Sequence, residues 1–101
     1  MIVEYIRYSI AEADREAFEA AYRLAQTALT RSPHCLAYEL SHCVDDRGSY
    51  VLRIEWDSAE GHLQGFRSSP EFREFLASVR PFVGAIAEMR HYEVTSVCLR
   101  K

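Results

Sequence analysis

Lysine is almost missing from this sequence, and acidic side chains outnumber basic ones by 15 to 12. Lys101 is the only lysine among 101 residues, and the formal net charge at pH 7 is -3. A protein that binds nucleic acid usually carries a stripe or patch of Lys and Arg, and this sequence has none. We therefore expect no nucleic acid among its partners.

Long apolar runs are missing as well. No run approaches the roughly 20 residues that a helix needs to cross a membrane. The first apolar stretch is interrupted by Glu4 and Arg7, which is untypical of a signal peptide. The sequence also has no internal repeat, linker or low-complexity tract. We expect a single domain over residues 1–101, located in the cytoplasm and not in a membrane.

Cysteine occurs only three times, as Cys35, Cys43 and Cys98. An odd number at wide, irregular spacing matches neither a disulfide framework nor a zinc signature. Reduced, buried thiols are the interpretation we favour, and no metal site is expected.

What the sequence does contain is a regular succession of apolar patterns with clear boundaries. The run over 2–10 is rich in β-branched and aromatic residues, which favours a strand. The stripe that includes Phe18 and Tyr22 has helical spacing, and Ser32-Pro33 ends that helix because the residue before proline avoids the α region. In chain order we expect a strand over 2–10, a helix over 14–32, strands over 35–44 and 50–56, helices over 59–67 and from Pro70, a helical turn from Pro81, and a strand over 89–97.

This order predicts the ferredoxin-like βαββαβ arrangement, an α+β fold with a four-stranded antiparallel sheet. Two helices can cover only one face of such a sheet. The other face would carry both aromatic and charged side chains, among them Tyr5, Tyr92, Arg53 and Glu55. We expect a second copy of the chain to pack there, and the alternative is a monomer with a half-polar sheet.

The only tryptophan, Trp56, lies where an alternating strand pattern changes to a helical one. Asp57 or Ser58 can supply the oxygen that caps the following helix. An indole is large and carries one N–H donor, so it rarely lies fully buried without a partner. We therefore expect Trp56 to be either the wall of a pocket or part of the core.

Three segments resemble the antibiotic biosynthesis monooxygenase family of dimeric α+β barrel proteins. They are 33–40 (PHCLAYEL), 55–60 (EWDSAE) and 66–75 (FRSSPEFREF), and the resemblance extends from Ile2 to about Thr95. It implies a homodimer that packs through its sheet faces and last strand, with a pocket between sheet and helices in each subunit. Members of the family include oxygenases that need neither metal nor flavin, quinol monooxygenases and haem-degrading enzymes, and others have no known activity.

Residues for such a pocket follow from the strand alternation and the helical stripes. His62 is the candidate acid or base, and Trp56 is the candidate wall beside it. The candidates for substrate binding are Tyr22, Tyr38, His42, Phe66 and Phe75. For His62 the alternative is a surface position, for His42 a strand histidine satisfied by a neighbour, and for most of the others plain core. We expect His91 to lie at the dimer contact.

Two features differ from the resembled family. Many relatives carry a helix histidine about one turn after His62, where this chain has Gly65 and Phe66. Haem-degrading relatives carry an asparagine on the first strand, where this chain has Ile6. The leading hypothesis is a cofactor-independent monooxygenase of a small aromatic substrate such as a phenol, a quinol or a polyketide. The alternatives are a non-catalytic dimeric module that binds an aromatic ligand, or haem through His62 or His42, and an interaction domain with a filled core.

Overall fold

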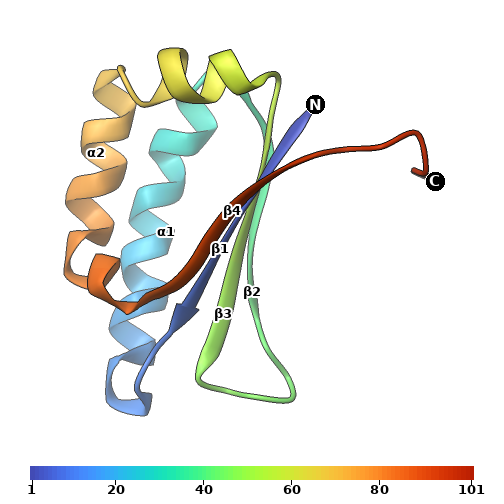
Figure 1. Ribbon diagram of the computed structural model, residues 1–101. Helices are drawn as coiled ribbons and strands as arrows, with labels where there is room; N and C mark the ends of the chain where they lie inside the picture. Colours follow the sequence, from blue (N-terminus) through green and yellow to red (C-terminus); the bar gives the residue numbers. More distant parts are fainter.

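The computed structural model describes all residues from Met1 to Lys101 as two layers, a sheet and a pair of helices (Figure 1). The sheet is antiparallel, with strand order β2-β3-β1-β4. The strands are β1 (Ile2–Ser9), β2 (Cys35–His42), β3 (Ser49–Trp56) and β4 (Ile86–Glu93), and the helices are α1 (Arg15–Arg31) and α2 (Pro70–Val79). Short 3₁₀ helices span Glu12–Asp14 and Arg80–Ala85, and a π-helical turn spans Gly61–Phe66. The predicted ferredoxin-like α+β fold is confirmed.

Local sequence signals account for the helix boundaries. α1 ends at Arg31, directly before Ser32-Pro33. Ser69 caps α2, since its Oγ accepts a hydrogen bond from the Phe72 N–H at 3.3 Å, and Pro70 occupies the first helical position. Ser58 caps the helical segment that begins at Ala59 and continues as the π-helical turn, because its Oγ accepts from the Gly61 N–H at 2.8 Å.

Two expected elements have different bounds. β4 runs over Ile86–Glu93, whereas a strand over 89–97 is the sequence prediction. The helical turn that begins near Pro81 was expected to include Ile86, but it ends at Ala85. Ile86 instead pairs with Tyr8, because β4 follows β1 along the whole length of β4. The segment after Trp56 closes as a π-helical turn, which is wider than the expected α-helix.

The core lies between the sheet and the two helices. Phe18, Tyr22, Ala25, Ala28 and Leu29 form the buried stripe of α1. They pack on side chains of β1 and β3, such as Tyr8, Tyr50 and Leu52. No helix of the structure combines the length and apolar character that a membrane crossing requires.

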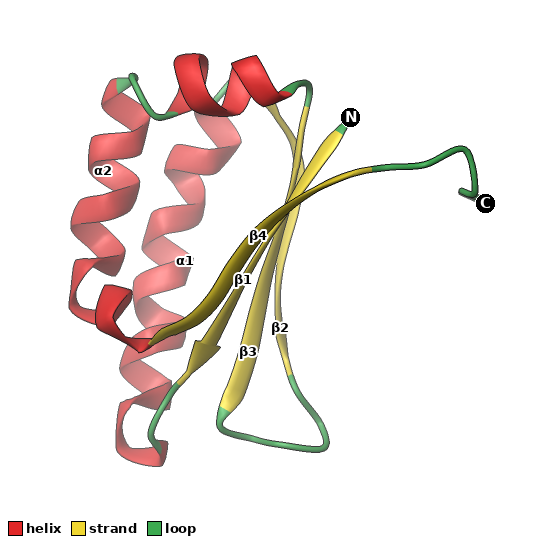
Figure 2. Ribbon diagram, in the orientation of Figure 1, coloured by secondary structure: helices red, strands yellow, loops and turns green.

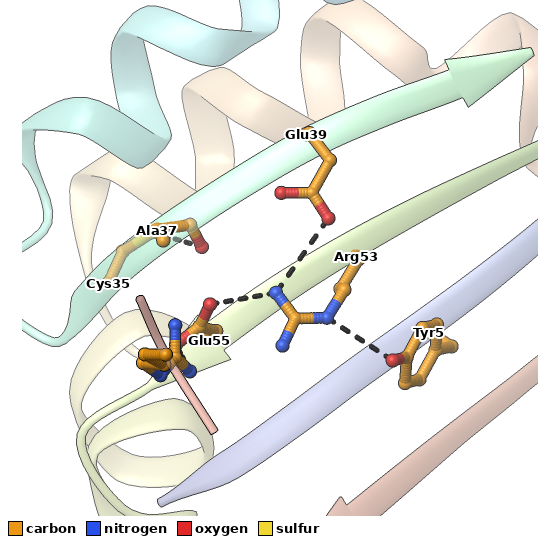
Figure 3. Close-up of polar contacts among 7 residues, drawn as sticks. Tyr5, Cys35, Ala37, Glu39, Arg53 and Glu55 are labelled. Atoms are coloured by element: carbon orange, nitrogen blue, oxygen red, sulfur yellow. Dashed lines mark hydrogen bonds and ion pairs between the residues drawn. The ribbon is translucent and has the colours of Figure 1, made fainter. Parts of the chain in front are cut away.

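The second face of the sheet has no helix over it, as Figure 2 shows. Arg53 lies at its centre, donating hydrogen bonds to the Tyr5 hydroxyl at 3.2 Å and to Glu55 at 2.7 Å, with Glu39 at 3.7 Å (Figure 3). The Tyr5 ring meets Tyr92 edge to face, at 5.5 Å between centroids. This face therefore combines an aromatic pair with a network of ion pairs.

The three cysteines are free, but their exposure differs from the expectation of buried thiols. Cys35 and Cys43 are half-buried, and Cys98 is exposed in the segment after β4. Burial raises the pKa of the Cys35 thiol to about 11, so this group is protonated at neutral pH.

Candidate functional site

A buried carboxylate on β1 organises the site. Ile2, Glu4, Ile6 and Tyr8 alternate toward the helices, so Glu4 lies on the apolar side of its strand. Its side chain is only 3% exposed. The indole N–H of Trp56 donates a hydrogen bond to Oε1 of Glu4 at 3.1 Å. The buried tryptophan thus has the polar partner that its N–H requires.

His62 packs against the same pair of residues from the π-helical turn. It is buried, and its ring lies 4.7 Å from the Trp56 ring between centroids. Its Nε2 is 3.7 Å from Oε2 of Glu4, and its Nδ1 is buried without a hydrogen-bond partner. The expected alternative of a surface position for His62 is therefore wrong.

His91 completes the cluster from β4, where its backbone pairs with Glu4 in the sheet register. Its Nε2 lies 3.2 Å from Oε2 of Glu4 and 3.0 Å from Nε2 of His62. Its side chain lies on the helix side of the sheet and is partly exposed, so its expected place at a dimer contact stays a prediction. Arg67 approaches Oε2 of Glu4 to 4.0 Å from the end of the π-helical turn.

Burial shifts the pKa values of Glu4 and His62 in opposite directions. It raises the pKa of Glu4 above the ordinary value, against the opposing effects of His91 and the Trp56 hydrogen bond. Burial, with further contributions from Arg67 and His91, lowers the pKa of His62 to about 4. The His62 imidazole is therefore neutral at pH 7, which leaves one ring nitrogen as a proton acceptor.

A cavity of about 170 Å³ begins at this cluster and extends between the sheet and α2. Glu4, His62 and Arg67 form its polar end. The rest of the lining is apolar and includes Ile6, Ile54, Phe66, Phe75 and Met89. An apolar cavity with a few polar groups at one end is the usual form of a small-molecule site.

The structure brings together three of the sequence-predicted residues, namely His62, Phe66 and Phe75, which all line the cavity. Trp56 is not part of its lining. The indole lies behind His62 and Phe66, with the Phe66 ring 4.9 Å away between centroids. Its contact with the site is made through Glu4 and His62.

The remaining predicted residues lie elsewhere. Tyr22 and Tyr38 line a separate groove of about 300 Å³ between α1 and β2. Tyr22 contacts two residues that line the cavity, Tyr8 by a hydrogen bond between the hydroxyls at 2.5 Å and Phe75 edge to face at 5.9 Å between ring centroids. His42 stacks on Tyr50, with ring centroids 4.0 Å apart, and its Nε2 lies 2.7 Å from the Arg47 carbonyl oxygen. The structure thus separates His42 from the cavity.

Neither histidine suits haem as a ligand. The Nε2 of His42 is already paired with a backbone carbonyl. The Nε2 of His62 faces His91 and Glu4 inside the protein. A cavity of about 170 Å³ is also too small for a porphyrin, because known pockets for drug-sized ligands start at about 300 Å³.

Glu4, His91 and Arg67 are the site residues that sequence reasoning missed. A signal for Glu4 was available, since it is a carboxylate in an alternation that is otherwise apolar, at Ile2, Ile6 and Tyr8. His91 has a comparable signal, because Tyr92 belongs to the uncovered face and the neighbouring residue must point the other way. No sequence pattern indicated Arg67.

A histidine–aspartate pair packs against the π-helical turn. Nδ1 of His34 lies 3.0 Å from Oδ2 of Asp57. A Cβ added at Gly65 would collide with the His34 ring, and one added at Gly61 would collide with the Asp57 carboxylate. The two glycines therefore let the turn lie close to this pair, which positions His62.

Comparison with known proteins places the chain in a family. A sequence model of antibiotic biosynthesis monooxygenases matches residues 1–78. The chain belongs to the antibiotic biosynthesis monooxygenase family. A curated relative, the uncharacterized protein YczJ of Bacillus subtilis, is 29% identical over 93 residues, which cover 92% of this chain and 98% of YczJ.

Solved structures of the antibiotic biosynthesis monooxygenase family share the fold. A candidate monooxygenase of Bordetella bronchiseptica superimposes with a TM-score of 0.73 at 24% identity, over 93% of this chain and 96% of the other. The structure of a variant of SnoaB from Streptomyces nogalater, a cofactor-independent oxygenase, superimposes with a TM-score of 0.72 at 18% identity. The match covers 97% of this chain and 94% of SnoaB. At these identities the similarity establishes the fold alone.

Proposed function

We propose that this protein is a cofactor-independent monooxygenase that oxidises a single-ring phenol or quinol with molecular oxygen. The observation that supports this most directly is the cavity of about 170 Å³ that ends at His62 and Glu4. A cavity of roughly 150 Å³ accommodates one benzene ring, so the volume suits a single ring better than a fused polyketide. Membership of the antibiotic biosynthesis monooxygenase family supports the reaction class.

In this proposal His62 is the catalytic base. The substrate ring lies among apolar side chains such as Phe66 and Phe75, with its hydroxyl toward the polar end of the cavity. The neutral His62 imidazole accepts the phenolic proton as the electron passes to O₂. The Glu4 carboxylate, 3.7 Å from Nε2, offsets the burial that otherwise disfavours the imidazolium. Trp56 is a positioning residue, because it contacts Glu4 and His62 and not the cavity.

The chemistry is carried by the substrate anion and oxygen. The phenolate gives one electron to O₂, and the phenoxyl radical and superoxide combine to form a C–O bond at a ring carbon that carries a hydrogen. In a phenol this is the carbon opposite the oxygen, and in a quinol, where that carbon carries the second hydroxyl, it is the carbon next to the oxygen-bearing one, so the product is a hydroxyquinone. The same carbon then loses its proton to a base while the O–O bond breaks, which releases water and a quinone. One phenol and one O₂ thus give one quinone and one water, with no external reductant. The protein supplies orientation, a base and exclusion of bulk water.

The predicted homodimer and aromatic ligand belong to the same proposal. The sheet face that carries Tyr5, Tyr92 and Arg53 has no helix over it, and partly exposed aromatic side chains favour contact with a second copy. Tyr38 and His42 have no part in substrate binding in this proposal, because neither lies at the cavity. Tyr22 acts only indirectly, through its contacts with Tyr8 and Phe75.

The experiment is oxygen uptake by protein that has been treated with chelator and is free of flavin. Hydroquinone and single-ring phenols should support uptake with quinone formation, and the three-ring anthrone should be turned over poorly. His62→Ala should abolish uptake while near-UV circular dichroism confirms an intact fold. Unchanged uptake by His62→Ala would show that the assigned base is wrong. Binding of phenols without oxygen uptake by the unaltered protein would support a non-catalytic binding module instead.

A further inference from the structure

Three side chains from different elements direct potential ligand atoms at one point. Nε2 of His62 and Nε2 of His91 are 3.0 Å apart, and Oε2 of Glu4 lies 3.2 Å from the latter and 3.7 Å from the former. With metal–ligand bonds of about 2.0–2.2 Å, neighbouring ligand atoms of a tetrahedral or octahedral ion stand roughly 3.0–3.5 Å apart. The three separations agree with this spacing to about 0.2 Å.

These three atoms carry too few protons to satisfy one another. A neutral imidazole has one N–H, and an ionised carboxylate has none. If Nε2 of His62 holds the proton, it donates to His91, and Oε2 of Glu4 then faces the lone pair of His91. If Nε2 of His91 holds the proton, this single proton faces two acceptors, Oε2 of Glu4 and Nε2 of His62. A cation at the centre would accept a lone pair from each atom and remove this conflict.

We propose that Glu4, His62 and His91 bind one divalent transition-metal ion of the Zn²⁺ or Fe²⁺ class. Two imidazoles and one carboxylate are a donor set that such ions favour, with positions left for water. These three residues are also the group of His and carboxylate side chains whose atoms converge closely enough to hold an ion. The sequence predicted no metal site, because the ligands lie far apart along the chain.

The surroundings of the three residues provide two further features of a metal site, a hydrogen bond that orients a ligand and a route of access. Trp56 donates to Oε1 of Glu4, which orients the carboxylate and leaves Oε2 for the ion. A hollow of about 400 Å³ lined by His62, His91 and Glu93 reaches the imidazoles from outside, with room for an ion to enter and for bound water. The Arg67 guanidinium opposes a cation, but its side chain is 39% exposed and can turn to solvent.

The competing arrangement is a simple ion pair between Glu4 and a protonated His91, with His62 as a neutral neighbour. It needs no metal and would bind none. Metal binding and the proposed oxygenase activity compete for one atom, because an ion bound at Nε2 of His62 occupies the lone pair that the base requires. The metal-bound protein is therefore expected to be inactive as an oxygenase. Binding itself is measured without substrate, so the two proposals are tested separately.

The test is titration of chelator-treated protein with Zn²⁺ by calorimetry, with Co²⁺ absorption as a second readout. We expect one ion per chain, and visible Co²⁺ bands of a site with nitrogen and oxygen ligands. His91→Gln should weaken Zn²⁺ binding by at least about tenfold. His42→Gln is the matched control, since it removes a strand histidine outside the cluster and should leave the affinity unchanged.

Two outcomes would overturn the proposal. One is the absence of stoichiometric Zn²⁺ binding to the unaltered protein at micromolar concentration, which would favour the ion pair. The other is equal Zn²⁺ affinity of His91→Gln and the unaltered protein. Because His91 is partly exposed on an edge strand, its replacement is expected to preserve the fold, which circular dichroism checks. If phenol-dependent oxygen uptake is absent but Zn²⁺ binds, the proposed function fails and the metal site stands.

Discussion

The indole N–H of Trp56 donates a 3.1 Å hydrogen bond to Glu4, and so ties the end of β3 to a buried carboxylate on β1. Both side chains are almost completely excluded from solvent. A carboxylate in such a place costs considerable solvation free energy unless hydrogen bonds and charges compensate it. Trp56, His91 and Arg67 provide that compensation. The carboxylate itself lies at the polar end of the cavity, with His62 and Arg67.

We predict that Trp56→Phe lowers the free energy of unfolding by about 1–3 kcal/mol, because Glu4 loses its neutral donor. Urea denaturation at fixed protein concentration measures this. Part of the loss comes from the smaller ring, so a double-mutant cycle with Glu4→Met, which removes the acceptor, isolates the hydrogen bond. A coupling free energy near zero between the two positions would contradict the interpretation.

Gly65→Ala should destabilise the protein by about 1–3 kcal/mol, because the new methyl group collides with the His34 ring under the π-helical turn. Gly84→Ala is the matched control, since a Cβ there meets nothing within 4 Å. Thermal unfolding compares the two. Adding His34→Ala to Gly65→Ala should recover much of the loss, and a lack of recovery would mean that the collision is not the cause.

We expect the Glu55 carboxylate to make the stability of the protein depend on pH. Its hydrogen bond from Arg53, supported by Arg100, holds the pKa of Glu55 below its ordinary value. A depressed pKa in the folded state stabilises the protein above the unfolded pKa of about 4.3, and this stabilisation is lost as pH falls through the folded value. Glu55→Gln should therefore be less stable than the unaltered protein at pH 7. The difference should shrink below about pH 4, and a difference that stays constant down to pH 2 would refute the assignment.

The uncovered sheet face predicts a dimer in solution. Light scattering at micromolar concentration should give twice the chain mass. Tyr92→Arg places a charge beside Tyr5 on this face and should shift the protein toward monomer. Leu24→Arg on the outer side of α1, where the leucine is 70% exposed, should leave the mass unchanged. A monomeric unaltered protein would exclude packing through the sheet.

The sequence by itself determined the order of elements and the fold class, because those depend on local periodicity and on capping signals. Ser69-Pro70 marks the start of α2, and alternation over 50–56 marks β3. The segment around Trp56 that resembles the family is similarly local. The predicted family is confirmed by the family model that matches residues 1–78. Phe66 and Phe75 were found because helical stripes identify the buried side of a helix.

Only the tertiary structure decided which polar groups meet. Alternation tells on which face Glu4 and His91 lie, but the register between β1 and β4 places them opposite one another. The width of the π-helical turn, permitted by Gly61 and Gly65, brings His62 onto the same pair. Register and turn width depend on contacts between segments far apart in the chain. Trp56 was therefore recognised from the sequence, whereas its place behind His62 and its bond to Glu4 were not.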